Sequence, residues 1–479
     1  MIPKRIDGIN LQYEDIKDVM FMDYNGDVLY SYDKDDFIQN VNELPPGPTW
    51  HSNLTFQEWN WDLADIKDEL QNGSGACCIG ACYETTDGKT HFIIDLKEED
   101  GVKDIQFYRI SRSGSLIVDW GDDTVETLSG NALTKHSYSN YGKYDIAITG
   151  NLSIAGNSRF MRAQNPLATG SYAGYSITNR FLTNVYTSSS CTMYANGSGN
   201  HQFAECINLK TFSSCKQLFS SSAQVSPISF QGVFNDNQNL RFFVFPKGAF
   251  NADTYAANYA FNLCFKGCQN MVSISFPKML TTLCMNQPMA SAGMRFLYFP
   301  SVTTLDSGNG YFAFDGNRNL QKVRMKFDNT VTSYTNGFAY ALMMHNYFIK
   351  DINFDKLGIT GLAHSCFYNC YSYDKTVTVA STVTQLNATF YCCYNVPKIV
   401  FLGDLTTISG AAFYNCLLCL EYNFTHCTTV PALAATNAFT SINTNAKIVV
   451  PDSLVSSWKA ASNWSAYASY IIGESDYNA

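Results

Sequence analysis

The side chains best suited to catalysis or metal binding are few and scattered along the 479 residues. Seven histidines occur, and none stands two or four residues from another, so none has the spacing of paired metal ligands. No G-x-S-x-G, H-E-x-x-H or phosphate-loop motif is present. Two carboxylates on a repeat face could serve a glycosidase, but the acidic residues recur at no shared position. We therefore expect no catalytic residue, no metal site and no cofactor.

The sixteen cysteines show a regularity of another kind. Five of them share with asparagine the fourth position of a recurring motif whose first position is aromatic or apolar and whose seventh and tenth are apolar. A buried thiol or amide there can hydrogen-bond backbone groups that would otherwise be unpaired, and stacked copies would form a ladder of mostly free thiols and amides. The expected ladder residues are Cys206, Asn237, Cys268, Asn317, Asn346, Cys370, Cys393 and Cys416.

The motif recurs ten times, at intervals of 23 to 31 residues. A unit of that length cannot bury its apolar side alone and must stack on its neighbours, which predicts a solenoid over residues 201–479. Each copy should contribute one short strand, and successive strands should stack about 4.8 Å apart. Degenerate copies start at Pro288 and Phe439. We expect a mainly β protein.

Alternation along each strand places the tenth and twelfth positions inward and the ninth and eleventh outward. The outward set mixes aromatic and charged side chains, which suits docking of a sugar or a protein. Single exposed aromatic residues are also ordinary on protein surfaces, so both interpretations stay open. The candidate ligand-binding residues are Phe242, Val244, Phe296, Tyr298, Lys322, Arg324, Asp351, Asn353 and Lys398.

Residues 1–104 differ from the rest in charge. They hold 22 of the 41 acidic and 8 of the 32 basic residues, a net charge of −14, whereas residues 105–479 carry a net charge of +5. The imbalance suggests that the two parts face different partners, and the basic excess is too dilute for nucleic-acid binding. Apolar alternation predicts hairpins at Asn25-Gly26 and Asp87-Gly88, and Asp62 can cap a helix. The segment is either an attachment module or a plain amino-terminal cap.

Residues 105–150 contain LIVDWGDDTVETL and KHSYSNYGKYDIAITG. These segments resemble the paired signatures of PKD-like immunoglobulin-type domains, which implies a small β-sandwich. Asp119, Asp122 and Asp123 could bind calcium, although capping the turn by accepting backbone N–H bonds is the simpler role. Asp123 stands where that family usually has glycine. Residues 151–200 are rich in Ser, Gly, Asn and Tyr, and we expect a linker that caps the first coil.

The repeated motif resembles BspA-type leucine-rich repeats, whose pattern is A-F-x-x-C-x-x-L-x-x-I-x-I-P. AFYNCLLCLEYNF, from Ala412, and FKGCQNMVSISFP, from Phe265, carry it most clearly. The final AKIVVPDSLVSSWKAASNWSAYASYI resembles the closing segment of that family. The resemblance implies a leucine-rich-repeat solenoid ended by a capping helix, with Trp458, Trp464 and Tyr467 packed over the last coil.

A solenoid offers a broad surface and seldom a catalytic pocket, so we expect a binding protein and no enzyme. The amino terminus lacks the apolar core of a secretory signal, and no apolar run reaches 18 residues, so we expect no membrane insertion.

The segment VMFMDYNGDVLYSY, with WNWDLADIK and ACYETTDGKTHFIIDL after it, resembles the leader of tail or fibre proteins of bacteriophages that infect gut bacteria. That resemblance implies a virion protein, made in the host cytoplasm and released by lysis. It would join other virion proteins through residues 1–104 and bind a host-surface protein or glycan through the solenoid. A bacterial surface adhesin and a purely structural capsid or tail decoration protein are the alternatives, and the chain could form a homo-oligomer.

Overall fold

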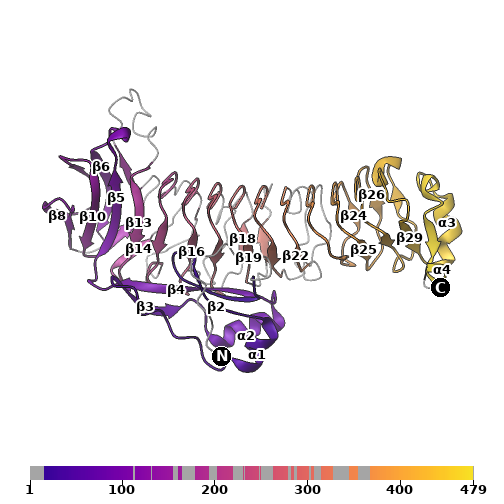
Figure 1. Cartoon of the computed structure of the whole chain (residues 1–479), viewed down its shortest axis with the longest axis horizontal. Coiled ribbons are helices and arrows are strands. Elements are labelled where there is room, and N and C mark those ends of the chain that lie inside the picture. The colour runs from indigo at the N-terminus through magenta and orange to yellow at the C-terminus, as the bar shows by residue number, and fades with distance from the viewer. Residues whose placement is uncertain are drawn as a thin grey trace. The chain divides into compact units, whose positions relative to one another are not determined.

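The computed structural model describes residues 16–111, 114–130, 132–154, 160–163, 179–193, 202–219, 230, 232–247, 249, 263–278, 282–284, 289–300, 304–306, 314–326, 345–353 and 367–477. The chain divides into two compact units, residues 1–282 with 292–300 and residues 283–291 with 301–479. Each unit is mainly β, as predicted (Figure 1). Most of the predicted linker at 151–200 lies outside the described residues.

A four-stranded sheet opens the first unit. Its strands are β1 (Val19–Met22), β2 (Val28–Tyr32), β3 (Leu54–Trp59) and β4 (Cys77–Thr85), in the order β2-β1-β4-β3. The predicted hairpin at Asn25-Gly26 is confirmed, because β1 pairs antiparallel with β2. Helices α1 (Lys34–Asn40) and α2 (Leu63–Asn72), the second starting directly after Asp62 as predicted, pack on one face. We name residues 16–85 the head module.

Two further sheets pack together as a β-sandwich. One has the strand order β15-β13-β5-β10-β7-β8, and the other the order β12-β6-β11-β14 with β9 beside β6. Between them Phe107 contacts Trp120 and Phe160, with ring centroids 5.6 and 5.7 Å away. The strands are β5 (Thr90–Leu96), β6 (Asp104–Ser111), β7 (Ser115–Asp119), β8 (Val125–Ser129), β9 (Ala132–Ser137), β10 (Gly142–Thr149), β11 (Leu152–Ile154), β12 (Met161–Ala163), β13 (Leu182–Tyr186) and β14 (Cys191–Met193).

The second predicted hairpin, at Asp87-Gly88, is wrong. The chain does turn there, with the Gly88 N–H donating to the Thr85 carbonyl at 3.1 Å. Strand β4, however, pairs with β1 and β3, whereas β5 pairs with β10 and β13. Alternation identified two strands correctly, but it carries no information about which neighbour each strand chooses. The sandwich consequently takes strands from both sides of residues 105–150.

The first coils grow out of the sandwich. Strand β15 (Thr211–Ser213) pairs parallel with β13, so the sandwich sheet continues into the stack. The next strands are β16 (Phe242–Val244), β17 (Ser273–Ser275), β18 (Thr282–Cys284) and β19 (Phe296–Tyr298), of which β16 and β17 pair in parallel. Inside the coils, Phe203, Phe234 and Phe265 stack ring on ring with centroids 5.7 and 5.5 Å apart. These are first positions of successive repeats, as predicted.

The third position has a positive φ in nine of the ten repeats, and in the copy placed at Pro288 the positive φ lies on the next residue, Ser291. This conformation lets the chain reverse before the strand. Glycine fills the third position at Gly267 (φ 76°) and Gly316 (φ 69°). At Gly267 an added Cβ would meet the Asp236 Oδ1 of the preceding repeat, so a larger residue there would have to displace that carboxylate. Other copies hold this conformation with Glu205, Asp236, His345, Asn369, Cys392, Asn415 and Ser441.

The second unit contains the more regular coils. Its main sheet is parallel, in the order β23-β25-β27-β29-β30, and a second parallel sheet has the order β24-β26-β28. The strands are β20 (Thr304–Asp306), β21 (Lys322–Arg324), β22 (Asp351–Ile352), β23 (Val377–Val379), β24 (Gln385–Leu386), β25 (Lys398–Phe401), β26 (Thr407–Ile408), β27 (Glu421–Asn423), β28 (Ala432–Leu433), β29 (Lys447–Val450) and β30 (Ile471–Gly473).

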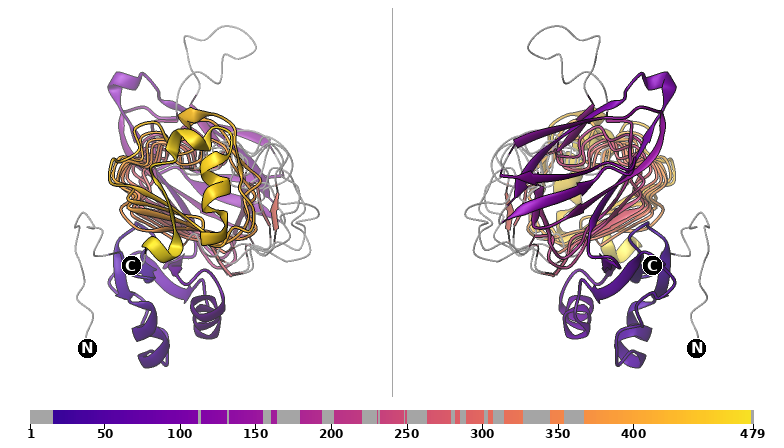
Figure 2. Two further views of the ribbon diagram at one scale, coloured as in Figure 1. Left: turned by 90° about the vertical axis from the view of Figure 1, so that its right-hand side faces the viewer. Right: turned by 90° about the vertical axis from the view of Figure 1, so that its left-hand side faces the viewer.

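The predicted carboxy-terminal cap is confirmed. Helix α3 (Val455–Ala460) lies across the last coil, as the left view of Figure 2 shows, and α4 (Glu474–Tyr477) ends the described chain. Trp458 and Trp464 are fully buried, and the Trp464 Nε1 donates to the Pro431 carbonyl at 2.8 Å. Phe424 contacts Trp458 with ring centroids 5.5 Å apart. Among the described helices, none has the length and apolar character needed to cross a membrane.

Candidate interaction surfaces

The outward strand face of the first coils is covered by the chain itself. Phe242, Phe296 and Tyr298 are buried, and with Val244 they form one apolar cluster with Met20 of β1 and its neighbours. Odd-numbered residues of β1 and β4 face the helices, while Met20, Met22, Cys78 and Cys82 face the coils. The prediction that these coil residues are exposed for a ligand is therefore wrong. The head module occupies their surface (Figure 1).

Close approach of the two layers depends on Gly80 in β4. An added Cβ there would lie 2.5 and 2.6 Å from the two methyl groups of Val244 and 3.0 Å from the Ser275 Cβ. The neighbouring Asn60 donates to both the Phe245 carbonyl and the Ser275 Oγ at 2.8 Å. The Asn60 amide and the Ser275 hydroxyl, both buried between the layers, are thus paired.

More hydrogen bonds fix the register of the head module on the coils. The Trp61 Nε1 donates to the Phe276 carbonyl at 2.6 Å, and the Tyr298 hydroxyl donates to the Lys17 carbonyl at 2.6 Å. The tyrosine that we had expected to offer a ring to a ligand therefore anchors the start of β1. Its hydroxyl acts inside the protein.

Ion pairs within the first unit compensate part of the charge imbalance of the sequence. Asp62 pairs with Lys247, and Asp65 and Asp68 both contact the Lys278 Nζ, at 3.1 and 2.7 Å. The Asp27 Oδ1 lies 3.6 Å from the Arg241 Nη1. These acids belong to the head module and the bases to the coils beneath it. Four acids of the head module are thus paired with bases of the first coils, which compensates part of the imbalance within the protein.

On the second unit, the outward strand residues pair with one another. Asp351 contacts the Arg324 guanidinium at 2.7 Å and Lys375 at 3.5 Å, and Lys398 contacts Glu421 at 2.8 Å. Burial opposes ionisation of Asp351, but Arg324 and the lysines outweigh it and lower the pKa of that carboxyl. This face is a charge-paired surface and offers a ligand little unsatisfied charge.

Two other predicted residues of this face also have internal roles. Asn353 bridges to the backbone of Met325, donating to its carbonyl at 2.7 Å and accepting from its N–H at 3.1 Å. Lys322 is buried and stands opposite Asp351 in the β21–β22 pairing. Ligand binding by this set remains a prediction.

The fourth-position side chains bond along the stack. The Asn237 Nδ2 donates to the Phe203 carbonyl at 2.8 Å, and the thiols of Cys268, Cys393 and Cys416 donate to the first-position carbonyl of the preceding repeat at 3.1 to 3.2 Å. Asn317 and Asn346 do the same to Met289 and Phe314. In the copy placed at Pro288 the acceptor is thus the next residue. Cys206 and Cys370 are buried at the same position.

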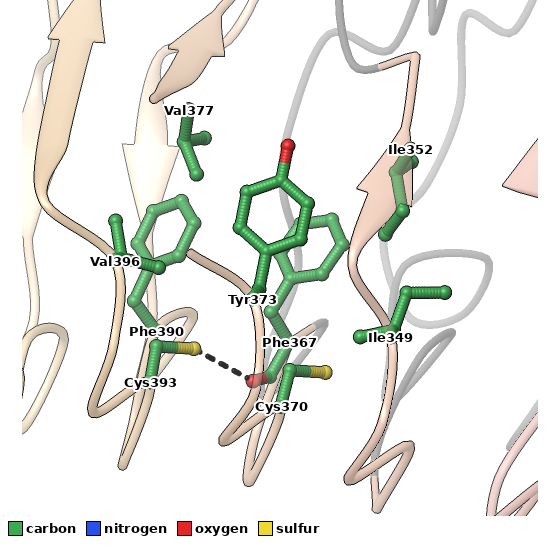
Figure 3. A pocket seen from close by; sticks show the side chains of 9 residues that line it. All are labelled: Ile349, Ile352, Phe367, Cys370, Tyr373, Val377, Phe390, Cys393 and Val396. Atoms are coloured by element: carbon green, nitrogen blue, oxygen red, sulfur yellow. Dashed lines mark hydrogen bonds between the residues drawn. The ribbon is translucent and has the colours of Figure 1, made fainter. Parts of the chain in front are cut away.

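A small apolar cavity lies in the interior beside this ladder. Its volume is about 10 Å³, and its wall includes Phe367, Cys370, Tyr373 and Val396 (Figure 3). That volume is at the lower limit for a single water molecule, and an apolar wall gives water no partner. The cavity is a packing defect between coils and no ligand site. Fourteen of the sixteen cysteines are described as buried thiols outside any disulfide.

The aspartates of the WGDDT segment cap a tight turn. The Asp119 Oδ1 accepts from the Gly121 N–H at 3.0 Å, and the Asp122 Oδ1 accepts from the Thr124 N–H at 3.3 Å. Asp123 takes a φ of 68°, the conformation that glycine adopts more readily. Within the described part of the chain, no group of three or more His, Cys, Asp or Glu side chains is arranged to hold a metal ion.

A surface that the sequence interpretation missed runs along the turns of the second unit. Tyr368, Tyr391 and Tyr414, at the second repeat position, stack with ring centroids 4.3 and 4.8 Å apart. A parallel row at the fifth position stacks at 5.0 and 4.7 Å, with interplanar angles of 6° and 3°. This second row consists of Tyr347, Tyr371 and Tyr394. The signal was present in FYNCYSY and FYCCYN, where tyrosine recurs at fixed positions.

Large apolar side chains next to these rows are exposed to solvent. Phe348, beside Tyr347, is 54% exposed. Leu417, Leu418 and Leu420 are 44%, 54% and 49% exposed, and Leu417 occupies the fifth position after Tyr394. We name these ten residues, six tyrosines and four apolar side chains, the tyrosine edge. It belongs wholly to the second unit.

The comparison with protein families agrees with the repeat pattern. Residues 262–351 and 310–446 match the family described as a BspA type Leucine rich repeat region, in six copies. A solved structure, that of a leucine-rich repeat protein from Bacteroides ovatus ATCC 8483, is 13% identical, with 75% of this chain and 98% of that chain covered and a TM-score of 0.20. No curated protein matches. The repeat region is therefore BspA-like.

Proposed function

We propose that this leucine-rich-repeat protein is a non-catalytic, adhesin-type binding protein that recognises its ligand through the tyrosine edge. The carrying observation is the exposed group Phe348, Leu417, Leu418 and Leu420, set beside two stacked tyrosine rows. Exposed apolar side chains gathered on one surface are typical of interaction sites, whereas isolated ones are not. The BspA-like repeats supply the rigid stack on which this surface is built.

The other solenoid surfaces favour this edge by elimination. The strand face of the first coils lies under the head module, and that of the second unit is charge-paired. The ladder side chains and the small cavity lie in the interior. On the second unit, the turns are where large apolar groups gather in solvent.

A narrower proposal, that the chain is a fibre or adhesin of a bacteriophage particle, is supported only by the resemblance of the leader segment. Attachment of the head module to other virion proteins would have to use the surface of that module that faces away from the coils. Proteomic analysis of purified particles tests this directly. Presence at a fixed ratio to the capsid protein would support the virion role, and absence from particles together with recovery at the bacterial surface would favour the cellular adhesin.

The proposed site is tested by cell binding. Fluorescently labelled full-length protein is applied to a panel of intact bacterial and epithelial cells, and binding is measured by flow cytometry. The variant Leu418→Ser, combined with Phe348→Ser, should lose at least tenfold in apparent affinity. Leu402→Ser is the matched control, because Leu402 is 42% exposed and follows the carboxyl end of β25, whereas the tyrosine edge lies at the turns that precede the strands. An equal loss of affinity in the double variant and in Leu402→Ser would refute the proposed site. Failure of the native protein to bind any cell in the panel would refute it as well.

A further inference from the structure

The tyrosine edge has features that select among classes of ligand, and this inference rests on the function proposed above. Its rings are stacked face to face, at centroid separations between 4.3 and 5.0 Å. Within each row, the ring faces are therefore occupied by neighbouring rings. A sugar ring binds an aromatic side chain by lying on its face, and the middle rings Tyr371 and Tyr391 have no face to offer. These middle rings present only their edges and hydroxyl groups, whereas each terminal ring keeps one face that no tyrosine of its row covers.

The edge also carries little net charge. Lys350 and Asp374, which lie beside the rows, contact each other at 3.8 Å. Burial and neighbouring groups raise the pKa of Tyr391 to about 12. A hydrogen bond with Cys392, followed by burial, raises the pKa of Tyr394 to about 12. The hydroxyl groups of Tyr391 and Tyr394 thus stay neutral at physiological pH, and charge complementarity favours an uncharged partner.

The exposed apolar residues specify the partner further. Leucine and phenylalanine side chains gain from being covered by other apolar groups, at about 25 cal/mol per Å² removed from water. Stacking already restrains the tyrosines, so their binding costs little side-chain entropy, which is why tyrosine dominates many binding surfaces. The chain itself offers a precedent, because the head module covers an apolar face of the first coils with methionine and cysteine side chains.

We infer that the tyrosine edge binds a protein segment with a central aliphatic stretch and no net charge, and that glycans are not its ligand. Leu417, Leu418, Leu420 and Phe348 would be covered by the aliphatic side chains. The tyrosine hydroxyl groups would hydrogen-bond the backbone of the segment at the margin. Such an arrangement, apolar in the centre and polar at the rim, is the usual anatomy of a protein interface.

The test uses the full-length protein against two probe sets. A random peptide-display library is selected on the immobilised protein, and a printed glycan array is probed with the labelled protein. Enriched peptides should share aliphatic residues and bind at least tenfold more weakly to the Leu417→Ser/Leu418→Ser/Leu420→Ser variant, with Leu402→Ser unaffected. Unchanged thermal unfolding of both variants, expected for exposed positions, shows that the fold is intact.

Each result decides something. A glycan that binds the protein and is lost in the triple variant overturns the inference while leaving the proposed adhesin function standing. Enriched peptides that bind the triple variant as well as the native protein also overturn it, because they use another surface. If neither probe set nor any cell in the panel binds, both the inference and the proposed function fail.

Discussion

Gly80→Ala should destabilise the protein, although alanine is normally the better residue in a strand. At an open strand position the change would stabilise by about 0.5–1 kcal/mol, because glycine loses more conformational freedom on folding. At Gly80 the new methyl group would lie 2.5 and 2.6 Å from the Val244 methyl groups, where contacts of 3.4–4 Å are ordinary. The two layers would have to separate by about 1 Å to restore such a contact. Overpacking of this kind costs about 1–3 kcal/mol.

A double-mutant cycle makes the reasoning specific to this contact. Val244→Ala alone removes two buried methyl groups and should cost at least about 1.6 kcal/mol, at about 0.8 kcal/mol per group. In the double variant the methyl group that Gly80→Ala introduces has room, so the total destabilisation should fall short of the sum by about 1 kcal/mol or more. Positions far apart and unconnected would add within about 0.5 kcal/mol.

The measurement is urea unfolding followed by tryptophan fluorescence, since Trp59 and Trp61 lie in the head module. The transition that these residues report should shift in Gly80→Ala to a lower urea concentration. A Gly80→Ala protein at least as stable as the native one would show that the layers do not interdigitate at this point. Additive losses in the double variant would show that Val244 is not what the methyl group meets.

Four further results are expected. A chain beginning at Asn151 should aggregate and bind a hydrophobic dye, because it exposes the coil face that the head module covers; a soluble monomer with a cooperative transition would contradict this. Asn317→Leu should lower the free energy of unfolding by about 1–3 kcal/mol, since the buried Met289 carbonyl loses its side-chain donor; equal stability in urea titrations would count against the ladder. Thiol titration should detect very few groups in the native protein at pH 8 and most of the sixteen cysteines after denaturation, and four or fewer after denaturation would indicate disulfides. Burial lowers the pKa of His91, but two aspartate partners outweigh it and raise that pKa overall, so the stability that His91 adds over His91→Gln should be full below about pH 6.5 and vanish as pH rises through the folded-state pKa; a constant difference from pH 5 to 9 would refute this.

The solenoid could be predicted from the sequence because its cause is local and repeated. Either cysteine or asparagine occupies the fourth repeat position, and both can donate to the first-position carbonyl of the preceding repeat. The pattern itself therefore reveals the ladder that Asn237 and Cys268 form. The closing tryptophans were equally predictable. Their burial was implied by the resemblance of the last segment, in which an amphipathic helix covers the end of the stack.

The covered strand face could not be predicted in the same way. Phe242 and Tyr298 look exposed because alternation says only that they leave the solenoid interior, and nothing local says what lies beyond. A clue did exist in VMFM and CCIGACY, where both faces of each strand are apolar. A sheet covered on both sides needs two partners, and the helices supply only one. The other partner, the coils, begins more than a hundred residues later.

The head module also constrains how the number of repeats can change during evolution. An extra coil inserted between Phe234 and Phe265 would move Phe296 and Tyr298 by about one strand spacing, 4.8 Å, away from the side chains that cover them. An extra coil inserted between Phe390 and Phe413 would only add one more tyrosine to each row and one more rung to the ladder. Among related chains, duplicated or deleted repeats should therefore gather in residues 367–439, while the coils under the head module keep a fixed count.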